Sequence, residues 1–246
     1  MERLIVTQFL YPAITYSNTS IFSDQYAFRP TRSPTAAIIS TSYCHSPAYR
    51  QSVCHRNLII FSKVFDTVRH SALLDKMMAQ LDMPDEVYNW LVSCFSGHSH
   101  CTHYRGNVSN VSEITASVIQ GSSIGPASYV VNTGDLQAVT PGNLMIKFAD
   151  DTYIIIPAIN ANSRLLELGN VELWSRANNL NVNPAKYAEI IFVDKKRKVT
   201  VQPPLPMTNN ARVTSMKVLG VTIGVNFYKA ARLEPPTFQT PRLSGL

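Results

Sequence analysis

Two adjacent acids, Asp150 and Asp151, interrupt an apolar stretch that runs from Leu144 to Ile156. The segments on either side have the composition of buried strands, so we expect the two acids at a tight turn between them. Paired carboxylates beside buried strands are unfavourable unless a cation neutralises them, and Mg²⁺ prefers such hard oxygen ligands. Asp is also a favoured residue in ordinary hairpin turns, so the pair taken alone favours a simple turn.

The composition allows a folded, basic domain. Of the 246 residues, 45% are hydrophobic and 15% are charged, which gives enough apolar surface for a core and argues against general disorder. The net charge of +6 suits a polyanionic partner. Between Lys186 and Arg232, nine basic residues stand against two acids. That stretch could follow a phosphate backbone, although Lys195–Lys198 could equally form a solvated hairpin tip.

The cysteines and the N-terminus exclude several classes of protein. Cys44, Cys54, Cys94 and Cys101 form no CxxC pair, so we expect free thiols rather than a zinc site or disulfides. The N-terminus has no basic region followed by a long apolar run, so we expect no signal peptide. No apolar stretch approaches the length of about 20 residues that a membrane-spanning helix needs.

Apolar periodicity predicts an alternation of helices and strands, an α+β layout. We expect a first helix to end at Pro12 and a short helix to begin near Pro34. A hairpin is expected around Gly106-Asn107, and a glycine-rich turn over 120–126 should lead into a helix. Further helices are predicted over 66–81, 84–95 and 162–180, strands over 58–61, 190–193 and 218–223, two strands meeting at Asp150-Asp151, and a linker over 203–206.

Segments on both sides of the acidic turn, taken in order, resemble the reverse transcriptases of LINE-type (non-LTR) retrotransposons. The resemblance extends from Glu2 to Ile223, and its strength lies in the shared order and spacing of motifs that are individually weak to moderate. The matching segments are Asp24–Pro30 with Arg32-Ser33 in the fingers, Phe61–His70 as the first palm motif, Gln120–Ser122 with Gly125-Pro126 as the second, Phe148–Thr152 as the third, Asn178–Asn183 with Lys186 as the fourth, and Leu219–Val221 at the palm–thumb border.

This resemblance implies a reverse transcriptase palm, an antiparallel sheet with helices on one face, together with partial fingers. The domains would be partial fingers over 1–57, the palm over 58–202, and a truncated palm–thumb border with an unstructured tail over 203–246. The implied activity is RNA-directed DNA polymerisation with two Mg²⁺ ions. The implied partners are an RNA template, a DNA primer and deoxynucleoside triphosphates, with no membrane and no obligate protein partner. The location would be cytoplasmic, nuclear or both.

The resemblance also assigns roles to individual residues. Asp150 and Asp151 would be the catalytic metal ligands. By themselves, Phe65 is typical of a core residue and Lys186 of a surface lysine, and only the family context gives them a role. The nucleotide would contact Phe65, Gln120, Gly121 and Lys186, and the nucleic-acid backbone would contact Arg29 and Arg32.

The chain departs from the family pattern at the first palm motif. The family carries a metal-binding Asp six residues before the position of Asp66, and Ile60 stands there. Isoleucine has no lone pair for Mg²⁺, so the resemblance implies an incomplete metal site. Ile119 also replaces the usual proline before Gln120, and the fingers begin partway while the thumb pattern is missing. We therefore expect a truncated, degenerate and inactive copy. A non-catalytic nucleic-acid-binding remnant and a pseudogene product remain open alternatives.

Overall fold

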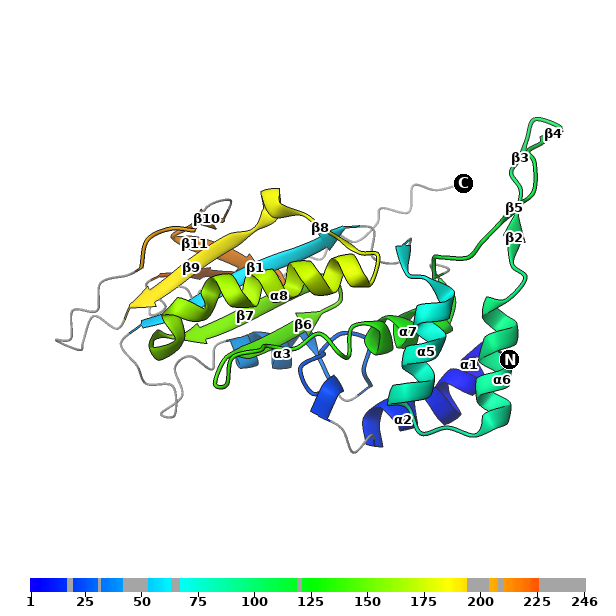
Figure 1. Ribbon diagram of the computed structural model, residues 1–246, viewed down its shortest axis with the longest axis horizontal. Coiled ribbons are helices and arrows are strands. Elements are labelled where there is room, and N and C mark those ends of the chain that lie inside the picture. The colour runs from blue at the N-terminus through cyan, green and yellow to red at the C-terminus, as the bar shows by residue number, and fades with distance from the viewer. Residues whose placement is uncertain are drawn as a thin grey trace, which may run out of the picture.

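The computed structural model describes residues 1–16, 20–30, 32–41, 53–62, 67–118, 121–193, 204–207 and 210–225, with only the backbone described for 53–62. Its centre is a sheet in the order β10-β9-β1-β7-β6, with β8 also paired to β1 (Figure 1). The pairs are antiparallel except β10 with β9. The strands of this sheet are β1 (Val53–Ser62), β6 (Leu144–Phe148), β7 (Asp151–Pro157), β8 (Asn181–Val182), β9 (Ala188–Val193) and β10 (Ala211–Arg212).

Helices pack on both faces and at one end of this sheet, and with the smaller hairpins they complete the α+β fold expected from the sequence. The helices are α1 (Glu2–Ile5), α2 (Tyr11–Tyr16), α3 (Pro34–Thr41), α5 (His70–Gln80), α6 (Asp85–Phe95), α7 (Ile124–Asn132) and α8 (Arg164–Ala177). The remaining strands are β2 (Ser99–His100), β3 (His103–Tyr104), β4 (Asn107–Val108), β5 (Ser112–Glu113), β11 (Ser215–Val218) and β12 (Val221–Gly224). Among the residues described, no helix is both long and apolar enough to cross a membrane.

The sheet is buried on both faces because side chains of β7 alternate between two apolar clusters. Ile154 and Ile156 belong to the cluster that includes Leu168 of α8 and the residues of α5, α6 and α7. Tyr153 and Ile155 belong to the cluster formed with α3 and the β11–β12 hairpin. Six consecutive β7 residues, from Thr152 to Pro157, are buried. A strand covered on both sides accounts for the unbroken apolar run in the sequence.

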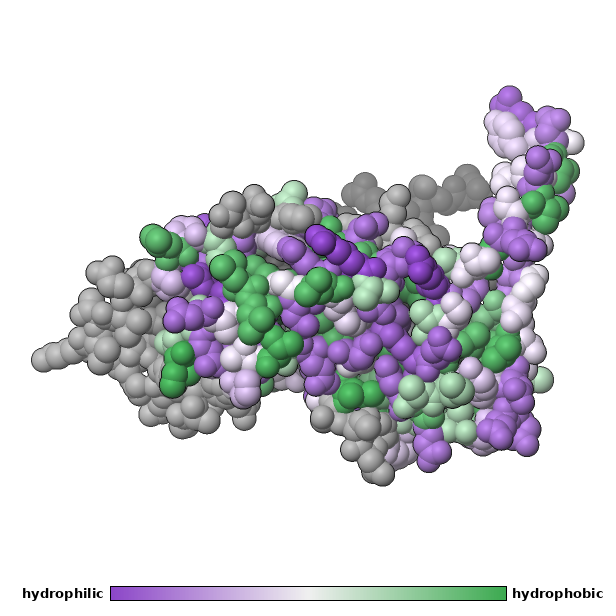
Figure 2. All heavy atoms as spheres, viewed as in Figure 1, coloured by the Kyte–Doolittle hydropathy of each residue, from purple (hydrophilic) through white to green (hydrophobic). Residues whose placement is uncertain are grey.

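The leucines of α8 divide between the core and the solvent. Leu168 and Val171 are buried, whereas Leu165, Leu166 and Leu173 are exposed by 61% or more. Figure 2 shows apolar side chains interspersed with polar ones on the face of the molecule where α8 lies. The helix is therefore anchored to the sheet by a narrower stripe than its leucine content indicates.

A segment of the expected fingers is joined to the edge of the sheet. Gln25 forms a parallel bridge with Lys147 of β6. The Tyr26 N–H donates to the Lys147 carbonyl at 2.8 Å, and the Lys147 N–H donates to the Asp24 carbonyl at 2.8 Å. These bonds place the first matching motif beside the strand that leads into the acidic turn.

The expected hairpin between α6 and α7 is confirmed. Strands β2 and β5 pair, and β3 and β4 pair beyond them, so that the hairpin extends away from the body (Figure 1). Arg105 and Gly106 both have positive φ, at 47° and 78°. Two consecutive left-handed residues are typical of a type I′ turn, whose twist matches that of the strands.

Two local expectations were wrong. Pro12 does not end the first helix, because it lies within α2 directly after a π-helical stretch, Val6–Leu10. A π-helical stretch shifts the backbone hydrogen bonds and can accommodate a proline that lacks an N–H group. The expected strand over 218–223 is instead the β11–β12 hairpin, since Leu219 and Gly220 adopt left-handed φ values of 47° and 87°.

Candidate functional site

The two acids lie at the tight turn between β6 and β7, as the sequence predicts. Strand β6 ends at Phe148 and β7 begins at Asp151, which pairs with Phe148. Asp150 is exposed and Asp151 is half-buried. Ala149 has a φ of 53°, and its carbonyl accepts a hydrogen bond of 2.6 Å from the Tyr129 hydroxyl. The turn thus holds two adjacent carboxylates at one edge of a buried sheet.

The electrostatic surroundings of Asp151 disfavour its negative charge. Burial raises the pKa of Asp151, and the neighbouring Asp150 raises it further. The Tyr153 hydroxyl, which lies 3.3 Å from Asp151 Oδ2, and the Lys186 ammonium both act in the opposite direction. Lys186 itself is exposed. The fourth motif therefore brings a positive charge within electrostatic range of the acidic turn.

The position across the sheet from Asp151 offers no third carboxylate. In the antiparallel register of β1 and β7, Ile60 is the direct partner of Asp151. Asp66 and Phe65 lie outside the described residues. Within the described ranges, no group of three or more His, Cys, Asp or Glu side chains could hold a metal ion. The residues at this turn therefore do not fit a complete two-metal centre.

The glycine of the second matching motif has the conformation that only glycine adopts readily. Gly121 has a φ of 92° and is exposed, and an added Cβ would meet no atom within 4 Å. The Ser122 hydroxyl accepts a hydrogen bond of 3.1 Å from the Gly125 N–H at the start of α7. An open, left-handed glycine before a capped helix allows a ligand to approach the backbone. Gln120 lies outside the described residues.

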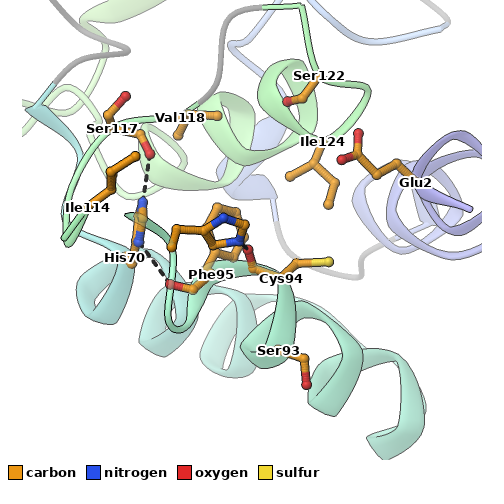
Figure 3. A pocket seen from close by; sticks show the side chains of 11 residues that line it. Glu2, His70, Ser93, Cys94, Phe95, Ile114, Ser117, Val118, Ser122 and Ile124 are labelled. Carbon is orange, nitrogen blue, oxygen red and sulfur yellow. Dashed lines mark hydrogen bonds between the residues drawn. The ribbon is translucent and has the colours of Figure 1, made fainter. Parts of the chain in front are cut away.

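A cavity of about 320 Å³ lies beside this turn, between α1, the end of α6 and the loop that enters α7 (Figure 3). At its wall, the His70 ring lies between two carbonyl groups, with Nδ1 3.0 Å from the Phe95 oxygen and Nε2 2.7 Å from the Ser117 oxygen. Glu2 Oε2 accepts from the Ser123 N–H at 3.1 Å. These contacts tie both ends of the loop that carries the second motif.

The two arginines expected to contact nucleic acid already have partners within the chain. Arg29 donates to the Phe22 carbonyl, and burial lowers the pKa of Arg29, with a further lowering by Arg32. The guanidinium of Arg32 lies 4.8 Å from the centre of the Tyr26 ring. Both side chains therefore stabilise the fingers segment, whatever else they bind.

Lys147 is a structural residue of the site that the sequence reading missed. Its ammonium is 3.0 Å from Asp24 Oδ1 and donates to the carbonyls of Thr133 and Leu136 at 2.7 and 2.8 Å. Burial lowers the pKa of Lys147 and raises that of Asp24 to about 6. The signal in the sequence was a single lysine inside the apolar strand Leu144–Phe148, where a charge needs a partner. This lysine joins the fingers segment, the end of α7 and β6.

A second buried charge cluster uses part of the basic C-terminal stretch. Glu189 is fully buried, and its two carboxylate oxygens accept from Arg164 Nη1 at 2.8 Å and from Arg212 Nη2 at 2.7 Å. Arg212 is thus an internal counterion rather than a free contact for phosphate. Lys195–Lys198, Lys229 and Arg232 lie outside the described residues.

Residues 2–223 match the family described as reverse transcriptase (RNA-dependent DNA polymerase). The RNA-directed DNA polymerase from mobile element jockey of Drosophila funebris is 30% identical over 146 residues, which are 55% of this chain and 16% of that protein. The probable RNA-directed DNA polymerase from transposon X-element of Drosophila melanogaster is 25% identical over 182 residues, which are 69% of this chain and 19% of that protein. The chain thus spans less than a fifth of the length of these relatives.

Solved structures share the fold at low sequence identity. Telomerase from Candida tropicalis, solved in complex with the TWJ fragment of telomeric RNA, superposes with a TM-score of 0.65 at 10% identity, covering 97% of this chain and 38% of that one. The apo form truncated from the C-terminal domain gives a TM-score of 0.62 at 12% identity, covering 92% and 43%. The expected palm-like fold is confirmed by this likeness.

Proposed function

The chain belongs to the reverse transcriptase family, as a domain of the non-LTR retrotransposon type, and we propose that its acidic turn is the remainder of a centre for template-directed nucleotidyl transfer. The observation that carries the proposal is the Asp150-Asp151 turn at the end of β6, with Ile60 of β1 directly opposite Asp151. Template RNA, a DNA primer and deoxynucleoside triphosphates would be the partners. In this copy the centre lacks a carboxylate, so we expect the chain to bind template and primer without extending it.

Two observations on the matching motifs support the proposal. Lys186 acts on the charge of Asp151, and the open backbone at Gly121 allows a ligand to approach it. Phe65 and Gln120 would complete the nucleotide side, and Arg29 and Arg32 would contact nucleic acid. Residues 1–57 would be partial fingers, 58–202 the palm and 203–246 the palm–thumb border. Mg²⁺ would supply charge neutralisation at such a centre, and with Ile60 opposite Asp151 we expect the two carboxylates of the turn to be too few to hold both ions.

The test is a primer-extension assay with Mg²⁺, a template–primer duplex and nucleotides. The unchanged chain is expected to add no nucleotide. Ile60→Asp is expected to gain Mg²⁺-dependent extension, because it restores a carboxylate opposite Asp151. Ile60→Asn is the matched control, since it has the same size without the charge. Addition of Asp150→Ala to the Ile60→Asp chain should abolish the gained activity.

Two results would contradict the proposal. Extension by the unchanged chain would show that Ile60 is compatible with catalysis. A folded Ile60→Asp chain that binds Mg²⁺ and still adds no nucleotide would show that the rest of the centre has also been lost.

A non-catalytic nucleic-acid-binding role is the second candidate, favoured by the net charge of +6 together with the missing ligand. Its signature is template–primer binding that weakens steeply as salt rises, because Lys and Arg contacts to phosphate release counterions. Absence of binding at low salt would rule this role out.

A further inference from the structure

The backbone of the acidic turn is held in an unfavourable conformation. Ala149 immediately precedes the two acids and has a φ of 53°. In the left-handed region the Cβ of an L residue crowds its own backbone, so such a residue stays there only when its surroundings hold it. The direction in which Asp150 and Asp151 leave the turn depends on this residue. Whatever holds Ala149 therefore also holds the two carboxylates.

The group that holds Ala149 is the hydroxyl of Tyr129. It lies 2.6 Å from the Ala149 carbonyl oxygen and donates to it. Tyr129 is only 2% exposed, and every residue of α7 except Pro126 is buried. A donor fixed on a fully packed helix has little freedom to follow the turn if the turn moves. The hydrogen bond therefore constrains the turn rather than the tyrosine.

The ring of Tyr129 is in turn positioned by the fingers segment. Phe28 packs against it edge to face, with ring centres 6.0 Å apart and an angle of 84° between the planes. Phe28 belongs to the segment that is joined to β6 through Gln25 and Lys147. Three segments far apart in the sequence thus meet in one chain of contacts, from Phe28 through Tyr129 to Ala149.

We propose that Tyr129 is a positioning residue for the acidic turn, and that through Phe28 it makes the orientation of Asp150 and Asp151 depend on how the fingers segment is seated. Tyr129 touches neither nucleotide nor reacting atoms in this role. It acts through the Ala149 carbonyl, as outer groups do when they fix the ligands of a catalytic centre. The catalytic consequence rests on the proposed function, whereas the structural consequence does not.

Amide hydrogen exchange of the otherwise unchanged chain tests the structural part. Tyr129→Phe removes only the hydroxyl, and we expect the amides of Phe148 and Asp151, which pair across the turn, to exchange about tenfold faster, the factor that one lost hydrogen bond provides. Ser175→Ala is the control, because it removes a buried hydroxyl that donates to the Glu172 carbonyl at 2.8 Å on α8, outside both the fingers segment and the turn. The control should leave the exchange of the turn amides unchanged.

Phe28→Leu supplies an independent variant that keeps the Tyr129 hydroxyl. Loss of the aromatic edge should accelerate the same amides by a smaller factor, about threefold, because the ring contact is weaker than the hydrogen bond. Unchanged exchange in both Tyr129→Phe and Phe28→Leu would overturn the proposal. Equal acceleration of the turn amides by Ser175→Ala would overturn it as well, because the effect would then reflect general stability.

The catalytic part is measured in the Ile60→Asp chain. There, Tyr129→Phe should lower kcat about tenfold while the KM for the nucleotide stays within about twofold, since the carboxylates are misplaced but the nucleotide contacts remain. An equal rise in KM with kcat unchanged would contradict a positioning role. If the Ile60→Asp chain adds no nucleotide, the proposed function fails, and hydrogen exchange still decides the role of Tyr129.

Discussion

Glu189 and the Asp150-Asp151 pair are carboxylates of one sheet that differ in burial and in the charges around them. Glu189 on β9 is fully buried and accepts from two guanidinium groups, those of Arg164 and Arg212. Asp150 and Asp151 lie at the end of β6, one exposed and one half-buried, and each repels the other. The chain thus neutralises Glu189 internally, whereas the negative charges of Asp150 and Asp151 repel each other at the edge of the sheet.

The difference separates an acid that the fold neutralises from the pair to which the proposed function assigns catalysis. A buried carboxylate without a counterion destabilises the fold, so Glu189 must be paired wherever the chain folds. Asp150 and Asp151 do not need a counterion for folding, because solvent reaches both side chains. The repulsion between their negative charges can therefore remain until a cation binds. Lys186 influences Asp151 only through charge and does not form a bonded pair with it among the contacts described.

The largest effect on stability is expected from removing the charge of Glu189. Glu189→Gln would leave two guanidinium groups without their counterion inside the protein, and we expect the free energy of unfolding to fall by about 3 kcal/mol. Urea unfolding measures the change. Glu113→Gln is the control, because Glu113 is exposed on β5 and its change should stay within a few tenths of a kcal/mol. Equal losses of stability from Glu189→Gln and Glu113→Gln would show that the buried ion pairs of Glu189 contribute no more to stability than an exposed acid does.

Asp24 is an intermediate case, with one close cation rather than two. Burial raises its pKa from 3.8 to about 6, although Lys147 and Arg29 act in the opposite direction. Because the pKa in the folded state is the higher one, the associated stability is present below pH 4 and is lost as the pH rises through about 6. Relative to Asp24→Asn, we expect the unchanged chain to lose about 2 kcal/mol between pH 4 and pH 7.

Urea unfolding of both chains at the two pH values measures this loss. Parallel pH profiles for the unchanged chain and Asp24→Asn would show that Lys147 fully compensates the burial of Asp24. In that case Asp24 would belong with Glu189 rather than between the two extremes.

The smallest effect is expected at the acidic turn itself. Asp150→Asn removes a like charge beside Asp151, so the pKa of Asp151 should fall toward its usual value. The free energy of unfolding should change by only a few tenths of a kcal/mol, because Asp150 is exposed. An NMR titration of the Asp151 carboxyl group follows the pKa. A large loss of stability would mean that Asp150 is a structural acid like Glu189.

Much of the fold could be predicted because its signals are local. The apolar runs around Asp150-Asp151 predict β6, β7 and the turn, and Gly106 predicts the tip of the hairpin. The first helix and the last strand were misread because a π-helical stretch accommodates Pro12, and because Leu219 adopts a left-handed conformation that no local pattern favours in leucine. Lys147 and Tyr129 were missed because their partners lie far away in the sequence.

Residue identity and order were enough to predict the family, the acidic turn and the isoleucine at the position where the family pattern has a carboxylate. The folded structure was needed to show that Ile60 pairs with Asp151, that two distant arginines neutralise Glu189, and that the Tyr129 hydroxyl donates to the Ala149 carbonyl. Strand register and buried contacts join residues that are far apart in the sequence, by 140 positions for Val53 and Val193. They follow from how whole elements pack, and no local pattern of residue types specifies them.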